Sequence, residues 1–252
     1  MQHMRDRLQA FGIHFLLSLL VAALAALLVF GLWFPYPYRE ISGGRELFML
    51  VMAVDVVMGP LITLMIFNPS KPRRELRLDL ALVGVLQLAA LAYGLSTVYA
   101  ARPVHLVFEY QRIAVVHAAD VDPAALAQAS PALQTLPLTG PTLLSLRPFK
   151  DGDEQYDSTM VAMGGIPQAA QPALWQPWDA ARVDILKESR PMAELKQRFA
   201  AQGALIDSAI VASARPADGL RYLPLLARKA GWTVLIDGQT AVPVGFLPLD
   251  SF

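Results

Sequence analysis

The sequence predicts a membrane protein in which three transmembrane α-helices are followed by an α+β domain with an antiparallel sheet. Hydrophobic residues make up 55% of the 252 residues and charged residues only 17%, whereas soluble domains contain about a quarter charged residues. The apolar excess lies before residue 102, while residues 103–252 alternate between short apolar runs and turn residues. We therefore expect two parts, a membrane region at 1–102 and a separate domain at 103–252.

Composition also excludes several classes of protein. Lys and Arg together number 21 and Asp and Glu together number 21, so the formal net charge is zero. This balance lacks the basic excess typical of nucleic-acid binders. The absence of cysteine excludes disulfide scaffolds, thiolate zinc sites and cysteine nucleophiles.

Three apolar runs, at about residues 13–34, 47–67 and 80–101, have the length of membrane spans. Each would form a helix of roughly 32 Å, which matches a hydrocarbon core of about 30 Å. The first and third runs contain no Asp, Glu, Lys or Arg, and the second contains only Asp55. Buried core helices of a soluble protein, or a cleaved signal peptide at the first run, are the alternatives. The runs lack the polar face of a buried core helix, which argues against the first alternative. Apolar residues continue after the cleavage-like Ala23-Leu24-Ala25, which argues against the second.

The basic residues beside the spans predict their orientation. Two Arg precede the first span and four Lys or Arg lie in the loop at 68–78, against two Arg in the loop at 35–46. Cytoplasmic flanks carry the excess of Lys and Arg. We therefore expect the N-terminus and the 68–78 loop in the cytoplasm, and residues 103–252 outside it.

Asp55 is the residue that costs most to place in a membrane, about 2.5–3.5 kcal/mol on insertion scales. Helical rise places Gln87 and Tyr93 of the third span at comparable depths. A hydrogen bond from Asp55 to either one would pin the second span to the third. The alternatives are a docking point for another membrane helix, and a proton relay, for which we find no second intramembrane carboxylate or basic group. Gly59-Pro60 in the same span predicts a kink.

The second domain shows a mixture of strand and helix signals. Asp237-Gly238 favours a tight hairpin turn, because glycine supplies the positive φ that such a turn requires. Gly203 is expected to cap the C-terminal end of a helix, and 164–179 reads as a packed loop. The expected strands are 104–109, 113–116, 143–146, 222–227, 232–236 and 241–247, and the expected helices begin near 123, 153, 180 and 191.

No catalytic or metal-binding constellation emerges from the sequence. The acidic cluster at 151–157 lacks the glycine and the final bidentate glutamate of a calcium loop. His105 and His117 lie on neighbouring predicted strands without a nearby third ligand. Trp175 and Trp178 are read as packing anchors. We therefore expect no enzyme activity, no cofactor and no metal.

The stretches that carry a family resemblance lie in and around the predicted spans and at the C-terminus. They are AFGIH at 10–14, WFPYPY at 33–38, VDVVMGPL at 54–61, FNP at 67–69, DL at 79–80, QLAALAYG at 87–94, ARPV at 101–104, TVLID at 233–237 and GFLP at 245–248. They resemble the type IV pilin accessory proteins of the TfpX/TfpZ type. The likeness is patchy between about 118 and 220, and residues 238–240 replace an expected Thr-Gly turn.

The resemblance implies a chaperone-like accessory factor of the bacterial inner membrane, with its C-terminal domain in the periplasm. Its expected partners are a major or minor type IV pilin subunit, the lipid bilayer and the pilus assembly machinery. Asp55, Gly59, Pro60, Gln87 and Tyr93 are then the candidates for contact with the pilin helix or for pinning the spans together. The alternative is a membrane-anchored extracytoplasmic sensor or ligand-binding subunit that works with a separate signalling protein.

Overall fold

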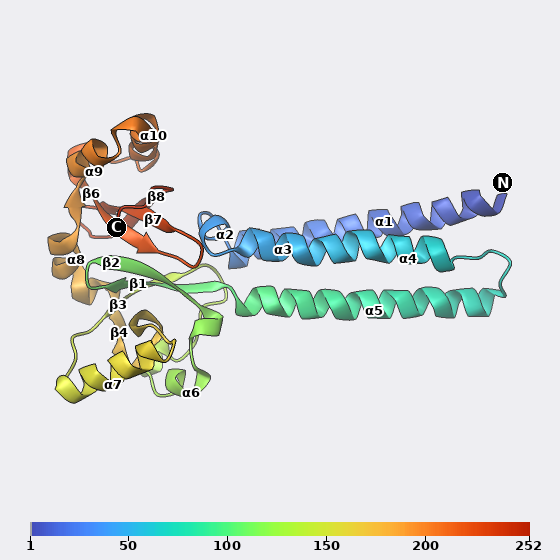
Figure 1. Cartoon of the computed structure of the whole chain (residues 1–252), viewed down its shortest axis with the longest axis horizontal. Coiled ribbons are helices and arrows are strands. Elements are labelled where there is room, and N and C mark those ends of the chain that lie inside the picture. Colours follow the sequence, from blue (N-terminus) through green and yellow to red (C-terminus); the bar gives the residue numbers. More distant parts are fainter. Residues whose placement is uncertain (1) are drawn as a thin grey trace. The chain divides into compact units, whose positions relative to one another are not determined.

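The computed structural model describes residues 2–252, which divide into two compact units (Figure 1). The helical unit contains the residues up to Arg39 together with Gly43–Ala101. The sheet unit contains Glu40–Ser42 and Arg102–Phe252. The short segment Glu40–Ser42 belongs to the sheet unit because Ile41 is tied to it through a main-chain hydrogen bond from Lys229, 3.1 Å long.

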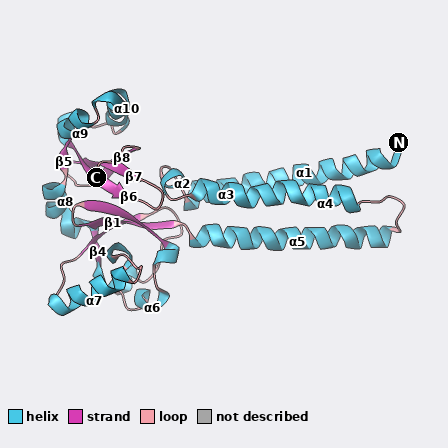
Figure 2. Ribbon diagram, viewed as in Figure 1, coloured by secondary structure: helices cyan, strands magenta, loops and turns pink. Residues whose placement is uncertain are grey.

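Three long helical segments form the helical unit (Figure 2). The first is α1 (Gln2–Leu28), which continues as the π-helical η1 (Val29–Trp33). The second comprises α3 (Gly44–Ala53), the π-helical η2 (Val54–Met58) and α4 (Gly59–Ile66), and the third is α5 (Arg73–Ala100); the short α2 (Tyr38–Ile41) lies between the first two. All three are long and apolar enough to cross a membrane.

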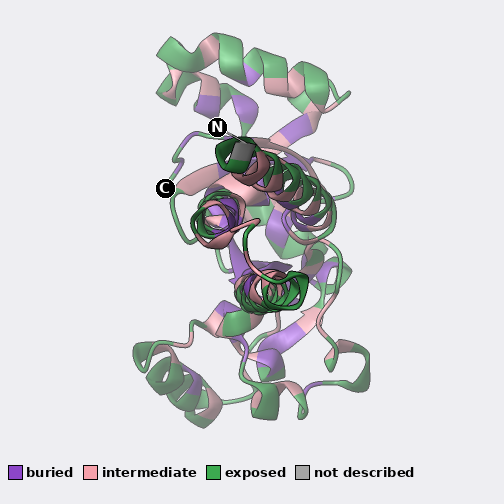
Figure 3. Cartoon of the chain, turned by 90° about the vertical axis from the view of Figure 1, so that its right-hand side faces the viewer, coloured by how far each residue is buried: buried purple, intermediate pink, exposed green. Residues whose placement is uncertain are grey.

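The helical unit has a small core and a large exposed apolar surface. The core gathers near the C-terminal ends of the first and third segments and the start of the second, and it contains Ala25, Val29, Phe34, Phe48, Met52, Val98 and Ala101. Two aromatic pairs stabilise this region, Phe30 with Phe48 and Trp33 with Tyr99, at ring separations of 4.9 Å and 5.1 Å. Elsewhere most large apolar side chains of these helices are exposed (Figure 3).

The sheet unit contains an eight-stranded mixed sheet in the order β4-β3-β1-β2-β6-β7-β8, with β5 paired to β6. The strands are β1 (Pro103–Glu109), β2 (Arg112–His117), β3 (Thr142–Leu146), β4 (Trp175–Pro177), β5 (Arg190–Pro191), β6 (Leu220–Leu226), β7 (Gly231–Asp237) and β8 (Pro243–Leu247). The prediction of an antiparallel sheet was wrong in two places, because β1–β3 and β2–β6 are parallel. Parallel neighbours need long crossover connections, and a local sequence pattern does not say which distant strands such connections bring together.

The two predicted hairpin regions are present in the structure. In the first, β1 and β2 pair antiparallel with Phe108 opposite Ile113, and Tyr110 in the turn has φ +59°. At the C-terminus, β6, β7 and β8 form an antiparallel meander. The last strand begins at Pro243 rather than at 241, because Ala241 has φ +62° and belongs to the turn.

The sheet unit contains one α-helix more than predicted, since α10 was not expected. They are α6 (Pro123–Leu126), α7 (Gly152–Met163), α8 (Arg182–Glu188), α9 (Met192–Arg198) and α10 (Gly203–Ala212). Gly203 was expected to end a helix, but its φ of −51° is right-handed and it begins α10. The predicted loop at 164–179 also contains the three-residue strand β4, whose brevity leaves no alternation to recognise.

Candidate functional site

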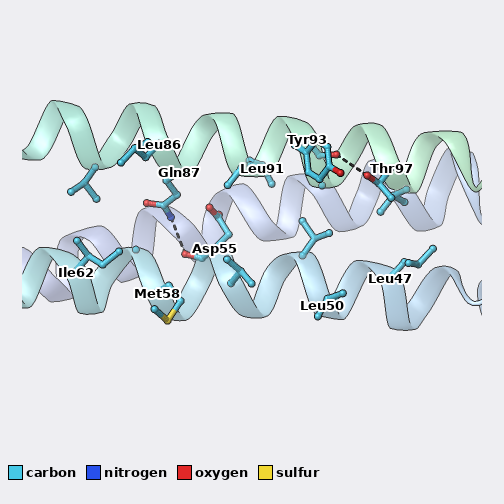
Figure 4. A pocket seen from close by; sticks show the side chains of 17 residues that line it. Leu47, Leu50, Asp55, Met58, Ile62, Leu86, Gln87, Leu91, Tyr93 and Thr97 are labelled. Atoms are coloured by element: carbon cyan, nitrogen blue, oxygen red, sulfur yellow. Dashed lines mark hydrogen bonds between the residues drawn. The ribbon is translucent and has the colours of Figure 1, made fainter.

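An apolar groove of about 540 Å³ runs along the second and third helical segments (Figure 4). Its walls come from α3, η2 and α4 on one side and from α5 on the other. The residues that line it include Leu47, Leu50, Val51, Asp55, Met58, Gly59, Ile62, Leu86, Gln87, Ala90, Tyr93, Gly94 and Thr97. Nearly all of these side chains are apolar, so the few polar groups in the groove determine what it can recognise.

Asp55 lies in η2 and is only 6% exposed. The Nε2 group of Gln87, on α5, donates a hydrogen bond of 2.8 Å to the main-chain carbonyl of Asp55 (Figure 4). In a π-helical turn that carbonyl would accept from the residue five positions ahead, which is Pro60 and has no N–H. Gln87 therefore supplies the donor that the proline removes, and it joins the second segment to the third.

Gln87 is also the centre of a polar network that reaches the first segment. Its Nε2 group donates to Oγ of Ser18 at 3.0 Å, and its Oε1 atom lies 2.7 Å from Nε2 of His14. Because a carbonyl oxygen only accepts, His14 Nε2 carries the hydrogen of that bond. The other ring nitrogen, Nδ1, lies 2.6 Å from Oγ1 of Thr63 on α4. All three helical segments thus meet at one amide.

Two glycines allow α5 to approach the second segment closely. A Cβ atom on Gly59 would lie 2.6 Å from the amide carbon of Gln87, and one on Gly94 would lie 2.6 Å from Cγ1 of Val51. Carbon atoms in contact are normally about 3.5–4.0 Å apart. Gly59 is therefore the position that makes room for the Gln87 amide.

The carboxylate of Asp55 takes no part in the network. Its Oδ1 atom is buried without a hydrogen-bond partner among the described residues. The sequence predicts a hydrogen bond from the side chain of Asp55 to Gln87 or Tyr93. In the structure, Gln87 bonds instead to the main-chain carbonyl of Asp55. Tyr93 does not reach Asp55; it lines the same groove with 77% of its surface exposed, and its carbonyl accepts from the hydroxyl groups of Ser96 and Thr97.

The structure thus brings Asp55, Gly59, Pro60 and Gln87 together and leaves Tyr93 apart. Sequence reasoning missed His14, Ser18 and Thr63. The prediction that the spans hold no second carboxylate or basic group was wrong, because the basic residue His14 lies inside the first one. A signal was available: His14 and Ser18 are four residues apart, on one face of a helix that is otherwise apolar.

The two histidines of the sheet unit each have a structural partner on Nδ1, while their Nε2 atoms are buried without one among the described residues. His105 Nδ1 lies 2.8 Å from Thr142 Oγ1, its ring packs against Trp175 at 4.7 Å, and burial lowers its pKa to about 4. His117 pairs with Asp120 at 3.0 Å. The two histidines are not directly opposite, because β1 has an irregularity between residues 103 and 105. Within residues 2–252 no cluster of three His, Asp or Glu is arranged to hold a metal.

The acidic cluster at 151–157 is likewise accounted for by local structure. Asp151 caps the N-terminus of α7 by accepting from the main-chain N–H of Glu154 at 2.8 Å. The Arg147 guanidinium, 2.6 Å away, and the Lys150 N–H group lower the pKa of Glu154 to about 2. These contacts order the start of a helix, and no three acidic side chains of this described segment are grouped to hold a cation.

Comparison with known proteins shows similarity along almost the whole chain. A family profile described as "Fimbrial assembly protein FimB" matches residues 2–43. The fimbrial assembly protein of Dichelobacter nodosus serogroup I is 37% identical over 243 residues, which are 96% of this chain and 94% of that protein. The serogroup E1 protein is 35% identical with the same coverage. The protein of serogroups C1 and C2 is 46% identical over 110 residues, 44% of this chain and 84% of its own. No solved structure is significantly similar.

Proposed function

The chain belongs to the fimbrial assembly protein family, and on this basis we propose that it is an inner-membrane accessory factor for type IV pilus biogenesis. The observation that carries the proposal is the 37% identity to a fimbrial assembly protein over 96% of the chain. The similarity extends over both units, so the proposed function refers to the helices and the sheet unit together.

The three apolar helices support a membrane location. They are 31, 23 and 28 residues long, and a helix of about 20 residues spans the hydrocarbon core. Most of their large side chains are apolar and exposed, which suits contact with lipid. The excess of Lys and Arg before the first helix and in the 68–78 loop supports a cytoplasmic location for those segments and a periplasmic one for the sheet unit.

We propose that the protein acts in a chaperone-like manner on a pilin subunit before or during its assembly. A pilin waiting in the membrane presents an apolar helix and a globular head outside. The groove between the second and third helical segments offers a site for the pilin helix, and the sheet unit offers a surface for the head. No catalytic step is part of this function.

A deletion strain tests the role in pilus biogenesis. We expect loss or strong reduction of surface pili, with recovery when the full-length chain is supplied from a plasmid. The pilin level in the membrane fraction separates two modes of action: a low level indicates stabilisation of pilin, and a normal level indicates assistance during assembly. Unchanged pili and unchanged pilin in the deletion strain would contradict the proposal.

Photocrosslinking in living cells tests the proposed contact with the pilin helix. Leu86 and Leu88 are on the same helix, at nearly the same depth and similarly exposed (62% and 64%), but only Leu86 lines the groove. A photoreactive residue at position 86 should capture pilin, and the same residue at position 88 should capture mainly lipid. Equal capture of pilin from both positions would argue against the groove as the contact.

A further inference from the structure

We propose that Asp55 is a specificity-determining residue, which selects a partner helix that carries a hydrogen-bond donor at the depth of Asp55. This inference rests on the proposed function, because it takes the groove as the seat of a partner's membrane helix. It adds to that function the chemical group that such a helix must present.

The dimensions of the groove fit a membrane helix better than a small ligand. Its wall on the second segment extends from Leu47 to Ile62, which is about 22 Å at 1.5 Å per residue. This length covers most of a hydrocarbon core of about 30 Å. The lining includes the small residue Ala90 on α5, and small residues allow helix backbones to approach closely.

Within this apolar groove Asp55 leaves one strong acceptor unsatisfied. Asp55 is only 6% exposed, and its Oδ1 atom has no hydrogen-bond partner among the described residues. Buried polar groups in proteins nearly always have hydrogen-bond partners. Lipid tails cannot supply one, so a lipid-filled groove leaves the carboxylate oxygen unsatisfied.

The helical unit itself does not supply the missing donor. Both hydrogens of the Gln87 amide are used, one on Ser18 Oγ and one on the main-chain carbonyl of Asp55. The hydroxyl group of Thr97, farther along the groove, is used on the carbonyl of Tyr93. These nearby donors fix the helices to one another, and the carboxylate oxygen is left without a partner.

The complementary occupant is a membrane helix with an apolar contact face and one donor, such as an amide, a hydroxyl or an amine. The donor should lie about 12 Å along the groove from Leu47, eight residues at the helical rise. An all-apolar helix would leave the carboxylate oxygen unpaired and would bind less tightly. Interhelical hydrogen bonds of this kind correspond to about a three- to twenty-fold change in affinity.

Binding of synthetic helices to the full-length protein in lipid nanodiscs tests the inference. The probes are fluorescent 20-residue Leu/Ala helices that differ only at one central position, Asn or Leu, read by energy transfer from a donor dye on the protein. The wild type should bind the Asn helix about three- to twenty-fold more tightly than the Leu helix. Moving the Asn by one turn in either direction should reduce this preference.

Two variants assign the preference to Asp55. Asp55→Leu should bind both helices equally, whereas Asp55→Asn keeps a carbonyl acceptor and should retain the preference. Leu88→Ala, outside the groove, is the matched control and should behave as the wild type. Circular dichroism of each variant shows whether the helices remain folded. If Asp55→Leu does not fold, the dependence of wild-type binding on the position of the probe Asn keeps the test decisive, and a preference that does not depend on this position would overturn the inference.

Equal affinity of the wild type for the two probe helices would overturn the inference, as would an unchanged preference in Asp55→Leu. Energy transfer between two labelled copies of the chain, with exclusion of both probes, would identify a second copy as the occupant and would also overturn it. These outcomes are distinct from failure of the proposed function. A deletion strain with normal pili would refute the function while leaving the measured helix preference intact.

Discussion

The helical unit and the sheet unit bury their apolar residues in opposite ways. In the sheet unit, side chains such as Leu195, Tyr222 and Leu235 are fully enclosed. In the helical unit, only 17%, 33% and 11% of the most apolar 18-residue stretch of the first, second and third long helix is buried. The sheet unit therefore completes its own core, while the helices leave their apolar surface for contact with other molecules.

The two units also treat buried carboxylates differently. In the sheet unit, Glu109 is paired with Arg112 at 2.7 Å and Asp237 with Arg215 at 2.7 Å. In the helical unit, Asp55 has a buried oxygen without a partner among the described residues. The carboxylates of the sheet unit thus find their partners within their own unit, whereas that of Asp55 does not find one among the described residues. This contrast between the two units can be tested by substitutions in each of them.

A core truncation in the sheet unit should cost far more than the same truncation on a span. Leu235→Ala removes a side chain with 0% exposure from a packed cluster, so we expect unfolding to require about 2–5 kcal/mol less free energy. Leu88→Ala removes a side chain that is 64% exposed and should change stability little. Urea unfolding of the full chain in detergent, followed by tryptophan fluorescence, measures both. Similar losses in the two variants would contradict the contrast.

The stability of the sheet unit should fall in mildly acidic solution because of His105. Burial lowers the pKa of this residue from 6.5 to about 4, so the folded state favours the neutral ring. Its contribution is fully present above pH 6.5 and is lost as the pH falls toward 4, where the loss reaches about 3 kcal/mol. Urea unfolding between pH 7.5 and pH 4 measures this slope.

His105→Asn provides the control for that slope. Asparagine can still bond the hydroxyl group of Thr142 but does not titrate in this range. The variant should therefore lose less stability between pH 6.5 and pH 4 than the wild type does. An identical pH dependence in the two proteins would assign the effect to another group.

Different physical signals explain which parts of the fold the sequence reveals. Long apolar runs without a polar face predict helices such as α5, because the pattern is local and the run is uninterrupted. The Asp237-Gly238 pair locates the last hairpin, again a local signal, but the expected positive φ at glycine was wrong, because Ala241 and not Gly238 adopts it. The parallel pairing of β1 with β3 depends on where the connection at 118–141 returns the chain, which is a tertiary effect that no local pattern contains.

The candidate site shows the same division. Asp55 stands out in the sequence because a carboxylate inside an apolar run is costly. The role of Gln87 does not stand out, because it depends on the main-chain acceptor that Pro60 leaves open on another helix. The link of His14 to Thr63 and Gln87 is not visible in the sequence, because it depends on how three separate helical segments pack together.

Adding one methyl group at Gly59 should disrupt the network of the helical unit. A Cβ there would press on the Gln87 amide, so Gly59→Ala should displace that amide from its hydrogen bonds and cost about 1–3 kcal/mol. Gly84→Ala, on α5, meets nothing within 4 Å and should be neutral or slightly stabilising. Thermal loss of helical circular dichroism in detergent measures both. A melting temperature of Gly59→Ala equal to that of Gly84→Ala would show that the network adds little stability.

The smallest effect is expected at Asp237, in the hairpin that ends the chain. Its Oδ1 atom accepts from the main-chain N–H groups of Gln239 and Thr240, each at 2.9 Å, and these bonds, with Arg215, lower its pKa to about 2. The stability that the charge contributes is present above pH 3.8 and is lost as the pH falls toward 2. Asp237→Asn keeps an acceptor for the turn, so at pH 7 we expect a loss of at most about 1 kcal/mol, because the partner guanidinium is half exposed. Urea unfolding at pH 7 and pH 3 should show the variant converging on the wild type at the lower pH. A constant difference between them would mean that the charge of Asp237 does not contribute and that the turn depends on side-chain shape alone.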